Sequence, residues 1–395
     1  PRRSRAAAAA AAAACFRGLA AAASRRRRRQ RAAVSAATAS STGAGGAPAR
    51  APRAAAAAAV AVGLVYLVAT CLNKLLFRVT LVPMGTSTHL LGVTTNMVYL
   101  GFFWMRCRRG MASGSVPKEA WDFLLRGRGC RLLMASGLTQ AVAFTVLPLF
   151  ARQLPGSSVT VIGQAMLPFS MLLSAIFLGR RYDALQFVGV AVVVLGIAVC
   201  IYPEALAELA ATAPGSAAAA GAPFVLSALG LLAGYFFNGA SFVLKEAAVV
   251  RYEEGSSERL SGDAVNFLTS LWQGITLWLL WPFNFAYLTP LSAREYFGNA
   301  WSVLQQPVNG GLVVVYWLLN VSYVSITLRA IMSLSSVVVL LLSTLSVPLV
   351  ALLFCLPLPW IGAAPFSWNS VAGVIVIFAG VLTYNHKQIL TKATS

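Results

Sequence analysis

Charged residues are scarce in this chain of 395 residues. Only 11% are Asp, Glu, Lys or Arg, whereas a soluble globular domain has about 25%. Hydrophobic residues make up 58%, and the mean hydropathy is +0.74. So few charges cannot cover the surface of a water-soluble protein, which excludes a soluble enzyme, a collagen and a coiled coil. The composition predicts a polytopic membrane protein.

Histidine and paired cysteine are also nearly absent. His89 and His386 are the only histidines, which leaves almost nothing from which to build a metal centre or a Ser-His-Asp triad. The six cysteines contain no C-x-x-C pair and lie mostly in or beside apolar runs, so we interpret them as small core residues. We therefore expect no metal, no cofactor and no enzymatic activity.

The amino-terminal segment lacks acidic residues. Glu119 is the first acid, and residues 1–53 hold twelve arginines that supply much of the net charge of +20. An acid-free leader rich in Arg, Ala and Ser is typical of an organelle transit peptide, and we predict that residues 1–53 are a disordered leader of this kind. A disordered extension without a targeting role is the alternative, whereas a nucleic-acid-binding arm would need interleaved aromatic residues. Because the chain starts at Pro1, we expect the polypeptide to begin further upstream.

Long apolar runs dominate the remaining sequence. A membrane-spanning helix needs about 20 apolar residues. Ten stretches reach that length without Asp, Glu, Lys or Arg: 54–73, 86–105, 132–150, 156–178, 184–202, 223–244, 264–287, 310–328, 332–356 and 365–385. They are continuously apolar and do not alternate, which excludes a barrel of strands. The predicted fold class is an all-α polytopic membrane protein with ten transmembrane helices.

Lysine and arginine are unevenly distributed between the loops. With the amino terminus inside, the inner segments carry 15 of the 19 basic residues that follow the leader. This asymmetry agrees with the positive-inside rule. It predicts an even number of spans, with both ends of the chain inside.

The outer loop between the seventh and eighth spans carries a helix signal of its own. Ser292 and Glu295 have the spacing of a capping box. Three apolar residues follow at i, i+4 and i+7: Phe297, Trp301 and Leu304. We predict an interfacial amphipathic helix near 292–305, with a loosely ordered loop as the alternative.

Several motifs recur at an offset of about 180 residues. Gly189 and Gly196 in the fifth span have counterparts with the same spacing in the tenth span, Gly373 and Gly380. A Ser-Ser pair followed by a proline occurs in the fourth and ninth spans, and polar residues in the third and eighth spans are 180 positions apart: Gln140 and Asn320. Three matches in the same order indicate an internal repeat.

This repeat divides the chain into two halves of five spans each. The halves are residues 54–202 and 223–387, joined by a linker at 203–222 and followed by a tail at 388–395. An odd number of spans places the two halves in opposite orientations. Inverted repeats are a transporter architecture with the substrate site at mid-membrane, so we expect a carrier.

Polar side chains inside the spans are the candidate substrate ligands, because burying them in a bilayer is costly. The seventh span shows the clearest stripe, with Asn266, Ser270 and Gln273 at i, i+4 and i+7. The predicted substrate-binding residues are Asn73, Lys74, Asn96, Gln140, Gln164, Asn266, Ser270, Gln273 and Asn320. For each residue alone, a hydrogen bond between helices is an equal alternative. The fifth and tenth spans have few such residues, so we expect them to form an apolar buttress.

Charged residues at the ends of spans have two interpretations each. Lys74 closes the first span, either as a cation that extends to the membrane surface from a helix carboxyl end or as a residue at the mouth of a cavity that attracts anions. Lys245 and Glu246 lie at the inner end of the sixth span. They form either an interfacial ion pair or a gate or proton-coupling element.

These motifs together resemble the chloroquine-resistance-transporter-like family of the drug/metabolite transporter superfamily. The matching residues are Cys71-Leu72-Asn73-Lys74, Thr80-Leu81, Gly85, Gln164 with Pro168, Arg180-Arg181-Tyr182, Ser241 to Glu246, Asn266 with Ser270 and Gln273, and Leu319-Asn320. The resemblance covers about residues 54–387. It implies a ten-helix carrier whose central cavity owes little to helices 5 and 10, and a cavity-facing Lys74 whose charge governs passage.

The resemblance also implies a location and a substrate. Plant members look like plastid-envelope transporters of glutathione and γ-glutamylcysteine, whereas vacuolar members export peptides and, when mutated, cationic drugs. The vacuolar members have cysteine bridges between helices 7 and 8, and loop 288–309 here has no cysteine. The plastid branch is therefore favoured. We expect a secondary transporter of small anionic thiol peptides in the plastid-envelope bilayer, with no nucleic-acid partner.

Three other functions compete with this prediction. A phosphate-ester or nucleotide-sugar carrier of the same superfamily would be expected to hold phosphate with Lys or Arg in its late helices, and the eighth to tenth spans contain none. A vacuolar-type exporter of drugs or peptides is the second alternative. An ion channel would need a filter of carbonyls or charged rings, for which no loop is visible.

Overall fold

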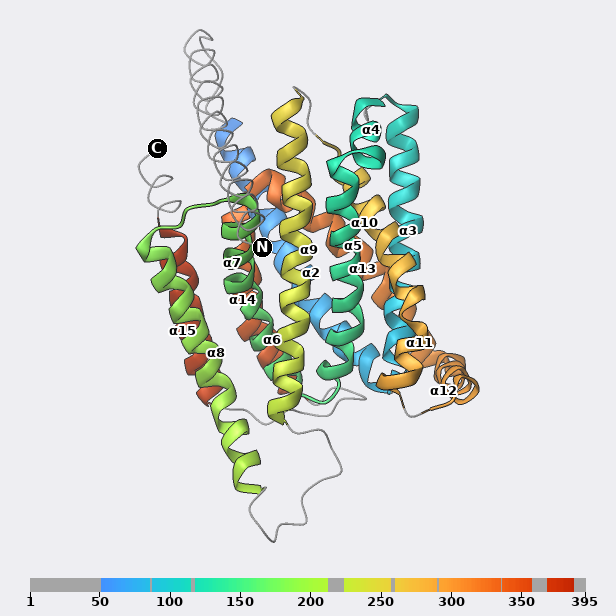
Figure 1. Ribbon diagram of the computed structural model, residues 1–395. Coiled ribbons are helices and arrows are strands. Elements are labelled where there is room, and N and C mark those ends of the chain that lie inside the picture. The colour runs from blue at the N-terminus through green and yellow to red at the C-terminus, as the bar shows by residue number, and fades with distance from the viewer. Residues whose placement is uncertain are drawn as a thin grey trace, which may run out of the picture.

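The computed structural model describes residues 51–386 except for gaps at 86, 115–117, 212–223, 257–259, 290, 335 and 357–367. Nearly all of the predicted leader, the second half of the predicted linker and the predicted tail lie outside this described part. Within it, every element is a helix and no strand occurs (Figure 1). The helices run in chain order as α2 (Ala51–Met84), α3 (Thr88–Ala112), α4 (Lys118–Arg126), α5 (Arg128–Ala151), α6 (Gly156–Ile162), η1 (Gly163–Ala165), α7 (Met166–Leu178), α8 (Ala184–Ala211), α9 (Phe224–Gly255), α10 (Gly262–Leu279), α11 (Trp281–Phe283), η2 (Asn284–Leu288), α12 (Ala293–Gln305), α13 (Pro307–Leu334), α14 (Ser336–Phe354) and α15 (Trp368–Tyr384).

The described part of each apolar stretch lies mostly within one of these helices or within consecutive helices. Six helices of the described part are long and apolar enough to cross a membrane: Val60–Met84, Arg128–Ala151, Gly156–Leu178, Ala184–Pro203, Phe224–Gly255 and Pro307–Thr327. Two shorter apolar helices are Leu342–Phe354 and Val371–Tyr384. The chain is thus a helical membrane protein, as predicted. The count of ten spans and the inverted repeat stay predictions.

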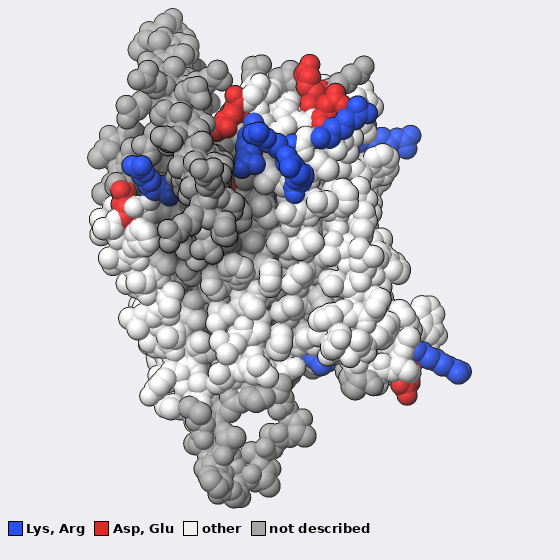
Figure 2. Space-filling view, in the orientation of Figure 1, with Lys and Arg blue, Asp and Glu red and all other residues white. Residues whose placement is uncertain are grey.

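The outer surface of the bundle is apolar where a bilayer would contact it. Leu195 of α8, Leu318 of α13 and Ile375 of α15 are each more than half exposed. Figure 2 shows Lys, Arg, Asp and Glu gathered near the two ends of the molecule, with a broad band of uncharged residues between them. An apolar belt of this extent is unfavourable in water and favourable in lipid.

Several features of the helices differ from the sequence-based expectations. Helix α2 continues to Met84, well past the predicted end of the first span at residue 73, so Lys74 lies inside the helix and does not close it. Residues 203–211, which we assigned to the linker, continue α8. A short helix, α4, lies between the second and third spans, where only a loop was expected, and it buries Ala120 and Leu124 against α5 and α9. Its mixed composition of charged and apolar residues does not stand out beside the much longer apolar runs.

Helices α8 and α15 pack backbone against backbone. A Cβ atom added to Gly189 or to Gly380 would lie 2.7 Å from the carbonyl oxygen of the other residue, and the same distance separates a Cβ on Gly196 or Gly373 from its opposite carbonyl. No side chain fits in these positions, so the glycines allow close approach of the two helices. The buried Val193 and Ile377 fill the contact between the glycines.

The other long helices pair across the bundle. Helix α5 packs along α9 and α2 along α13, while α7 also contacts α9 and α14 also contacts α2. Helix α3 packs against α10. Helices from both halves of the sequence therefore lie around the middle of the molecule.

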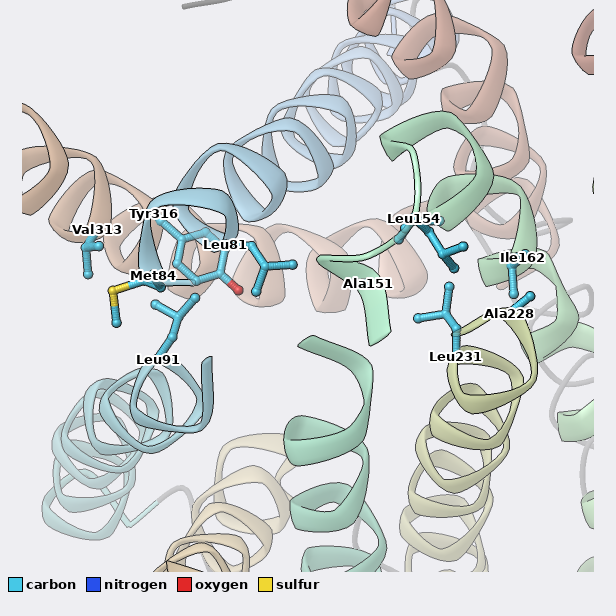
Figure 3. Close-up of a cluster of buried hydrophobic side chains, with 11 residues drawn as sticks. Leu81, Met84, Leu91, Ala151, Leu154, Ile162, Ala228, Leu231, Val313 and Tyr316 are labelled. Atoms are coloured by element: carbon cyan, nitrogen blue, oxygen red, sulfur yellow. The ribbon is translucent and has the colours of Figure 1, made fainter. Parts of the chain in front are cut away.

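An apolar cluster closes one end of this bundle, where α2 and α5 end and α9 and α13 begin (Figure 3). Its core includes Leu81 of α2, Leu154 after α5, Leu231 of α9 and Tyr316 of α13. Leu81 and Leu231 are completely buried. The predicted orientation makes this the outer end.

Helix α12 is anchored at the same end. The Ser292 hydroxyl accepts a hydrogen bond from the Glu295 amide (3.3 Å), and the Glu295 carboxylate accepts one from the Ser292 amide (2.9 Å). The predicted capping box is therefore present, and its hydrogen bonds hold the pKa of Glu295 below its usual value. Tyr296 is fully buried, and its hydroxyl accepts a hydrogen bond from the Leu90 amide (3.1 Å). The position of α12 at the membrane surface stays a prediction.

Candidate functional site

A cavity of about 290 Å³, lined by both polar and apolar residues, lies between helices of the two predicted halves. Five rods contribute to it: α2, the α6–η1–α7 rod, α9, α13 and α14. The lining residues are Asn73, Lys74, Phe77, Arg78, Gly156, Val159, Thr160, Gly163, Gln164, Met166, Tyr235, Asn238, Tyr323, Ser343 and Phe354. Among the described side chains of α8 and α15, none lines the cavity.

Lys74 supplies a positive charge to this cavity. Its ammonium group donates a hydrogen bond to the Ser346 hydroxyl at 2.8 Å, and that hydroxyl donates to the Ser343 carbonyl at 2.6 Å. The side chain therefore crosses from α2 to α14. This direction does not agree with the alternative interpretation, in which Lys74 extends along its helix toward the membrane surface.

Within the described part of the chain, no acidic residue pairs with Lys74. None of the described residues that line the cavity is Asp or Glu. The two ion pairs found in the described part lie elsewhere: Arg106 with Asp263 at 3.0 Å, and Arg180 with Glu246. Because the cavity has uncompensated positive charge, its electrostatic potential favours an anion.

The α6–η1–α7 rod is interrupted where it borders the cavity. Residues Gly163–Ala165 form a turn of 3₁₀ helix between α6 and α7. Pro168 has no N–H group, so the carbonyl of Gln164 loses the donor that a regular α-helix would provide. The Gln164 side chain lines the cavity, and its Oε1 accepts a hydrogen bond from the Thr344 hydroxyl at 3.5 Å. Short 3₁₀ turns inside long helices often mark functional hinges.

Six of the remaining lining residues are neutral and polar: Asn73, Thr160, Tyr235, Asn238, Tyr323 and Ser343. The Asn73 Oδ1 atom is buried and has no hydrogen-bond partner within the described residues. Asn238 donates only a weak hydrogen bond to the Met166 sulfur at 3.6 Å. A buried polar atom without a partner costs free energy that a bound ligand can recover.

Three of the nine predicted substrate-binding residues line this cavity: Asn73, Lys74 and Gln164. Sequence analysis missed Arg78, Tyr235 and Asn238 among others. Arg78 follows Lys74 by four residues, so helical spacing alone would have placed it on the same face of α2. Tyr235 and Asn238 have the same relation, at i and i+3 on α9.

A second buried polar cluster lies where α3 crosses α10. Asn96 donates a hydrogen bond to the Ser270 carbonyl at 3.1 Å, and both Asn96 and Gln273 are almost completely buried. The Asn96 Oδ1 and Gln273 Nε2 atoms have no partner within the described part of the chain. Asn266 lies half-buried one turn earlier on α10. That these four residues contact substrate stays a prediction.

The other predicted residues belong to separate contacts between helices. The Tyr99 hydroxyl donates to Asn320 Oδ1 at 2.5 Å, joining α3 to α13. Gln140 Oε1 accepts hydrogen bonds from Lys245 (2.8 Å) and from the Ser241 hydroxyl (3.0 Å), joining α5 to α9. Lys245 and Glu246 do not pair with each other. Lys245 binds Gln140, and Glu246 binds Arg180.

Comparison with known proteins identifies the relatives of this chain. The family model of CRT-like, chloroquine-resistance transporter-like proteins matches residues 60–306. "Protein CLT1, chloroplastic" of Arabidopsis thaliana is 29% identical over 335 residues, which cover 79% of this chain and 69% of the relative. "Protein CLT2, chloroplastic" of the same plant is 26% identical over 366 residues, which cover 84% of this chain and 77% of the relative.

A more distant relative is "Crt homolog 3" of Dictyostelium discoideum, 27% identical over 142 residues, or 36% of this chain and 29% of that protein. The chloroplast relatives and the apolar helices together make the chain a multi-pass plastid membrane protein, as predicted. The resemblance drawn from the sequence motifs is confirmed, and the chain belongs to the CRT-like, chloroquine-resistance transporter-like family, a family of transporters.

Proposed function

We propose that the chain is a secondary transporter of the plastid envelope that carries glutathione, γ-glutamylcysteine or similar small anionic peptides. The observation that carries this proposal is the cavity between helices of both halves, with Lys74 in its lining and no acidic residue among the described residues around it. At neutral pH these peptides have a net negative charge, because their carboxylates outnumber their single amine. The cavity volume of about 290 Å³ lies at the lower end of the range for small-molecule sites, which favours a compact substrate.

The transport mechanism that we propose is alternating access in two inverted halves of five spans each. Helix pairing supports it. If α2, α3, α5, α7 and α8 of the first half are exchanged in order with α9, α10, α13, α14 and α15 of the second, the α5–α9 contact becomes α13–α2 and the α7–α9 contact becomes α14–α2. The same exchange maps the α8–α15 and α3–α10 contacts onto themselves. Gln164 and Thr344, which are 180 positions apart, also contact each other. Inverted-repeat carriers bind substrate at the interface between their two halves, and helices of both proposed halves line this cavity.

Gating is the role that we propose for Lys245 and Glu246. Glu246 on α9 forms an ion pair with Arg180, which follows α7, so a change in that pair would couple the inner ends of two spans. Lys245 joins the same end of α9 to α5 through Gln140. Coupling of transport to a proton gradient remains part of this proposal.

Targeting is the role that we propose for residues 1–53. The expected result is that a fluorescent reporter fused behind this segment accumulates in plastids. Diffuse cytosolic fluorescence, or vacuolar fluorescence of the full-length fusion, would contradict the proposal.

The function is tested by uptake into proteoliposomes that contain the purified full-length protein. Radiolabelled glutathione, γ-glutamylcysteine, a sugar nucleotide and chloroquine are compared side by side, with and without a pH gradient. We expect saturable uptake of the two thiol peptides. Preference for the sugar nucleotide would instead identify a phosphate-ester carrier, and preference for chloroquine a vacuolar-type exporter.

A further inference from the structure

Arg78 is a second cation in the lining of the central cavity. It follows Lys74 by one helical turn on α2, and residues at this spacing have side chains on the same face of a helix. The two charges thus reach the same space from positions about 6 Å apart along the helix axis. Neither of them forms an ion pair within the described residues.

The guanidinium group of Arg78 is held by one edge only. Its Nη1 atom donates a hydrogen bond to the carbonyl of Ala151, the last residue of α5. Ala151 itself lies in the apolar cluster at the outer end, which fixes the position of that carbonyl (Figure 3). The Nε atom is buried and has no hydrogen-bond partner within the described part. The anchoring contact therefore does not use the Nε–Nη2 edge, the one that binds a carboxylate with two parallel hydrogen bonds.

Other arginines near the bundle are paired differently. Arg106 and Arg180 each bind a carboxylate, Asp263 and Glu246 respectively. Burying a cation without a counter-charge costs free energy, and a bound anion offsets that cost. Arg78 and Lys74 thus have no counter-charge among the described residues, and a bound anion can supply one.

We propose that Arg78 is a second anion-binding residue of the transport site and that, with Lys74, it selects substrates with two carboxylates. This inference rests on the proposed transport function and names its substrate class, the small dicarboxylates. Lys74 binds one carboxylate as a compact point charge, and the free edge of Arg78 binds the other. The competing explanation is that Arg78 only ties α2 to the end of α5.

The test compares substrates that differ in one carboxylate. Uptake of glutathione and of its glycyl monoethyl ester is measured in proteoliposomes that contain the wild-type protein, Arg78→Gln, Arg78→Lys or the matched control Arg152→Gln. Arg152 is also at the end of α5 and donates to a backbone carbonyl, that of Gly85 (2.6 Å), but it does not line the cavity. Size-exclusion chromatography checks that each variant is folded.

We expect the wild type to favour glutathione over the monoester by about tenfold in kcat/KM, the ratio that one charge-assisted contact of about 1.4 kcal/mol provides. Arg78→Gln should bring this ratio close to one, Arg78→Lys should keep most of it, and Arg152→Gln should leave it unchanged. An unchanged ratio in Arg78→Gln would overturn the proposal. An equal loss of uptake for both substrates would also overturn it, because that is the result of a purely structural contact.

A binding measurement separates failure of this inference from failure of the proposed function. γ-Glutamylglycine has two carboxylates but no thiol, and its effect on the melting temperature of the purified protein needs no transport. If no thiol peptide is taken up but γ-glutamylglycine stabilises the wild type and not Arg78→Gln, the proposed function is wrong and the dicarboxylate site stands. If glutathione is transported and Arg78→Gln keeps its preference, the function stands and the inference is wrong.

Discussion

Two helix crossings, α8–α15 and α3–α10, join the proposed halves in opposite ways. Between α8 and α15, glycine carbonyls lie where no Cβ could fit, and the space around them is filled by apolar side chains. Between α3 and α10, the contact contains buried Asn96 and Gln273, each with a polar atom that has no partner among the described residues. The first crossing is closely packed and apolar, whereas the second contains buried polar atoms without partners in the described part.

This difference indicates that α8–α15 has a supporting role and α3–α10 a functional one. A close glycine contact has no alternative arrangement of similar energy, so α8 and α15 are suited to act as a fixed frame. An unpartnered buried amide costs about 1–3 kcal/mol, a cost that evolution tolerates where another state or a ligand recovers it. The central cavity agrees with this division, because its described lining includes no residue of α8 or α15.

The largest expected effect is on the glycine crossing. In Gly196→Leu, the new Cβ would lie 2.7 Å from the Gly373 carbonyl oxygen, so the helices must separate. We expect a loss of about 3 kcal/mol or more, at the upper end of overpacking costs, and little folded protein by size-exclusion chromatography. The control is Gly101→Leu, also inside a helix but with nothing within 4 Å of its Cβ position. Equal folding of both variants would show that α8 and α15 are not a fixed frame.

The next effect is on the charge of the cavity. In Lys74→Thr, an anionic substrate loses an attraction of roughly 1–4 kcal/mol at about 4 Å. The KM for glutathione should therefore rise by about fivefold or more, while entry of the cation chloroquine should become easier. Lys74→Arg keeps the sign of the charge and should retain much of the wild-type behaviour. Uptake of both compounds by both variants measures this. If anion and cation uptake change in the same direction, the charge of Lys74 does not select the substrate.

A smaller effect is expected at the α3–α10 crossing. Gln273→Leu removes an amide whose nitrogen has no partner within the described residues, so the amount of folded protein should stay near that of the wild type. If the unpartnered atoms serve substrate in another state of the transport cycle, uptake of glutathione should fall severalfold. Ser241→Ala on α9, a residue of the α5–α9 contact, is the comparison for a simple interhelical hydrogen bond. Normal uptake by Gln273→Leu would make α3–α10 a packing contact and remove the contrast with α8–α15.

Sequence reasoning found the helices but only part of the cavity. Continuous apolar runs locate membrane helices well, because the bilayer imposes a length of about 20 residues and excludes charge. Sequence reasoning missed α4, because the mixed composition of this helix resembles that of a loop. It also ended α8 too early, because the helix continues past the last residue of the apolar run.

The cavity was harder to predict because polarity inside a span has several causes. Asn73, Lys74 and Gln164 line the cavity, but Asn320 and Gln140 form hydrogen bonds between helices with Tyr99 and Lys245. The sequence contains the same residue types in both situations. Only the rotation of each helix about its axis distinguishes them, and that rotation depends on packing partners that are distant in the sequence.

The smallest expected effect is at α12, which extends the comparison to the outer end of the bundle. The capping box with Ser292 lowers the pKa of Glu295, so its folded-state pKa is below the unfolded value. A group shifted in this direction stabilises the folded helix fully above the unfolded pKa of about 4.3 and loses that contribution as the pH falls through the lowered value. Amide hydrogen-exchange protection of residues 293–305 should therefore be constant from pH 7 to pH 5 and decrease below pH 4. In Glu295→Gln, the side chain still accepts the Ser292 amide but does not titrate, so its protection should be independent of pH in this range. A decrease of equal size in both proteins would mean that acid releases α12 through another group and that the capping box does not hold this helix in place.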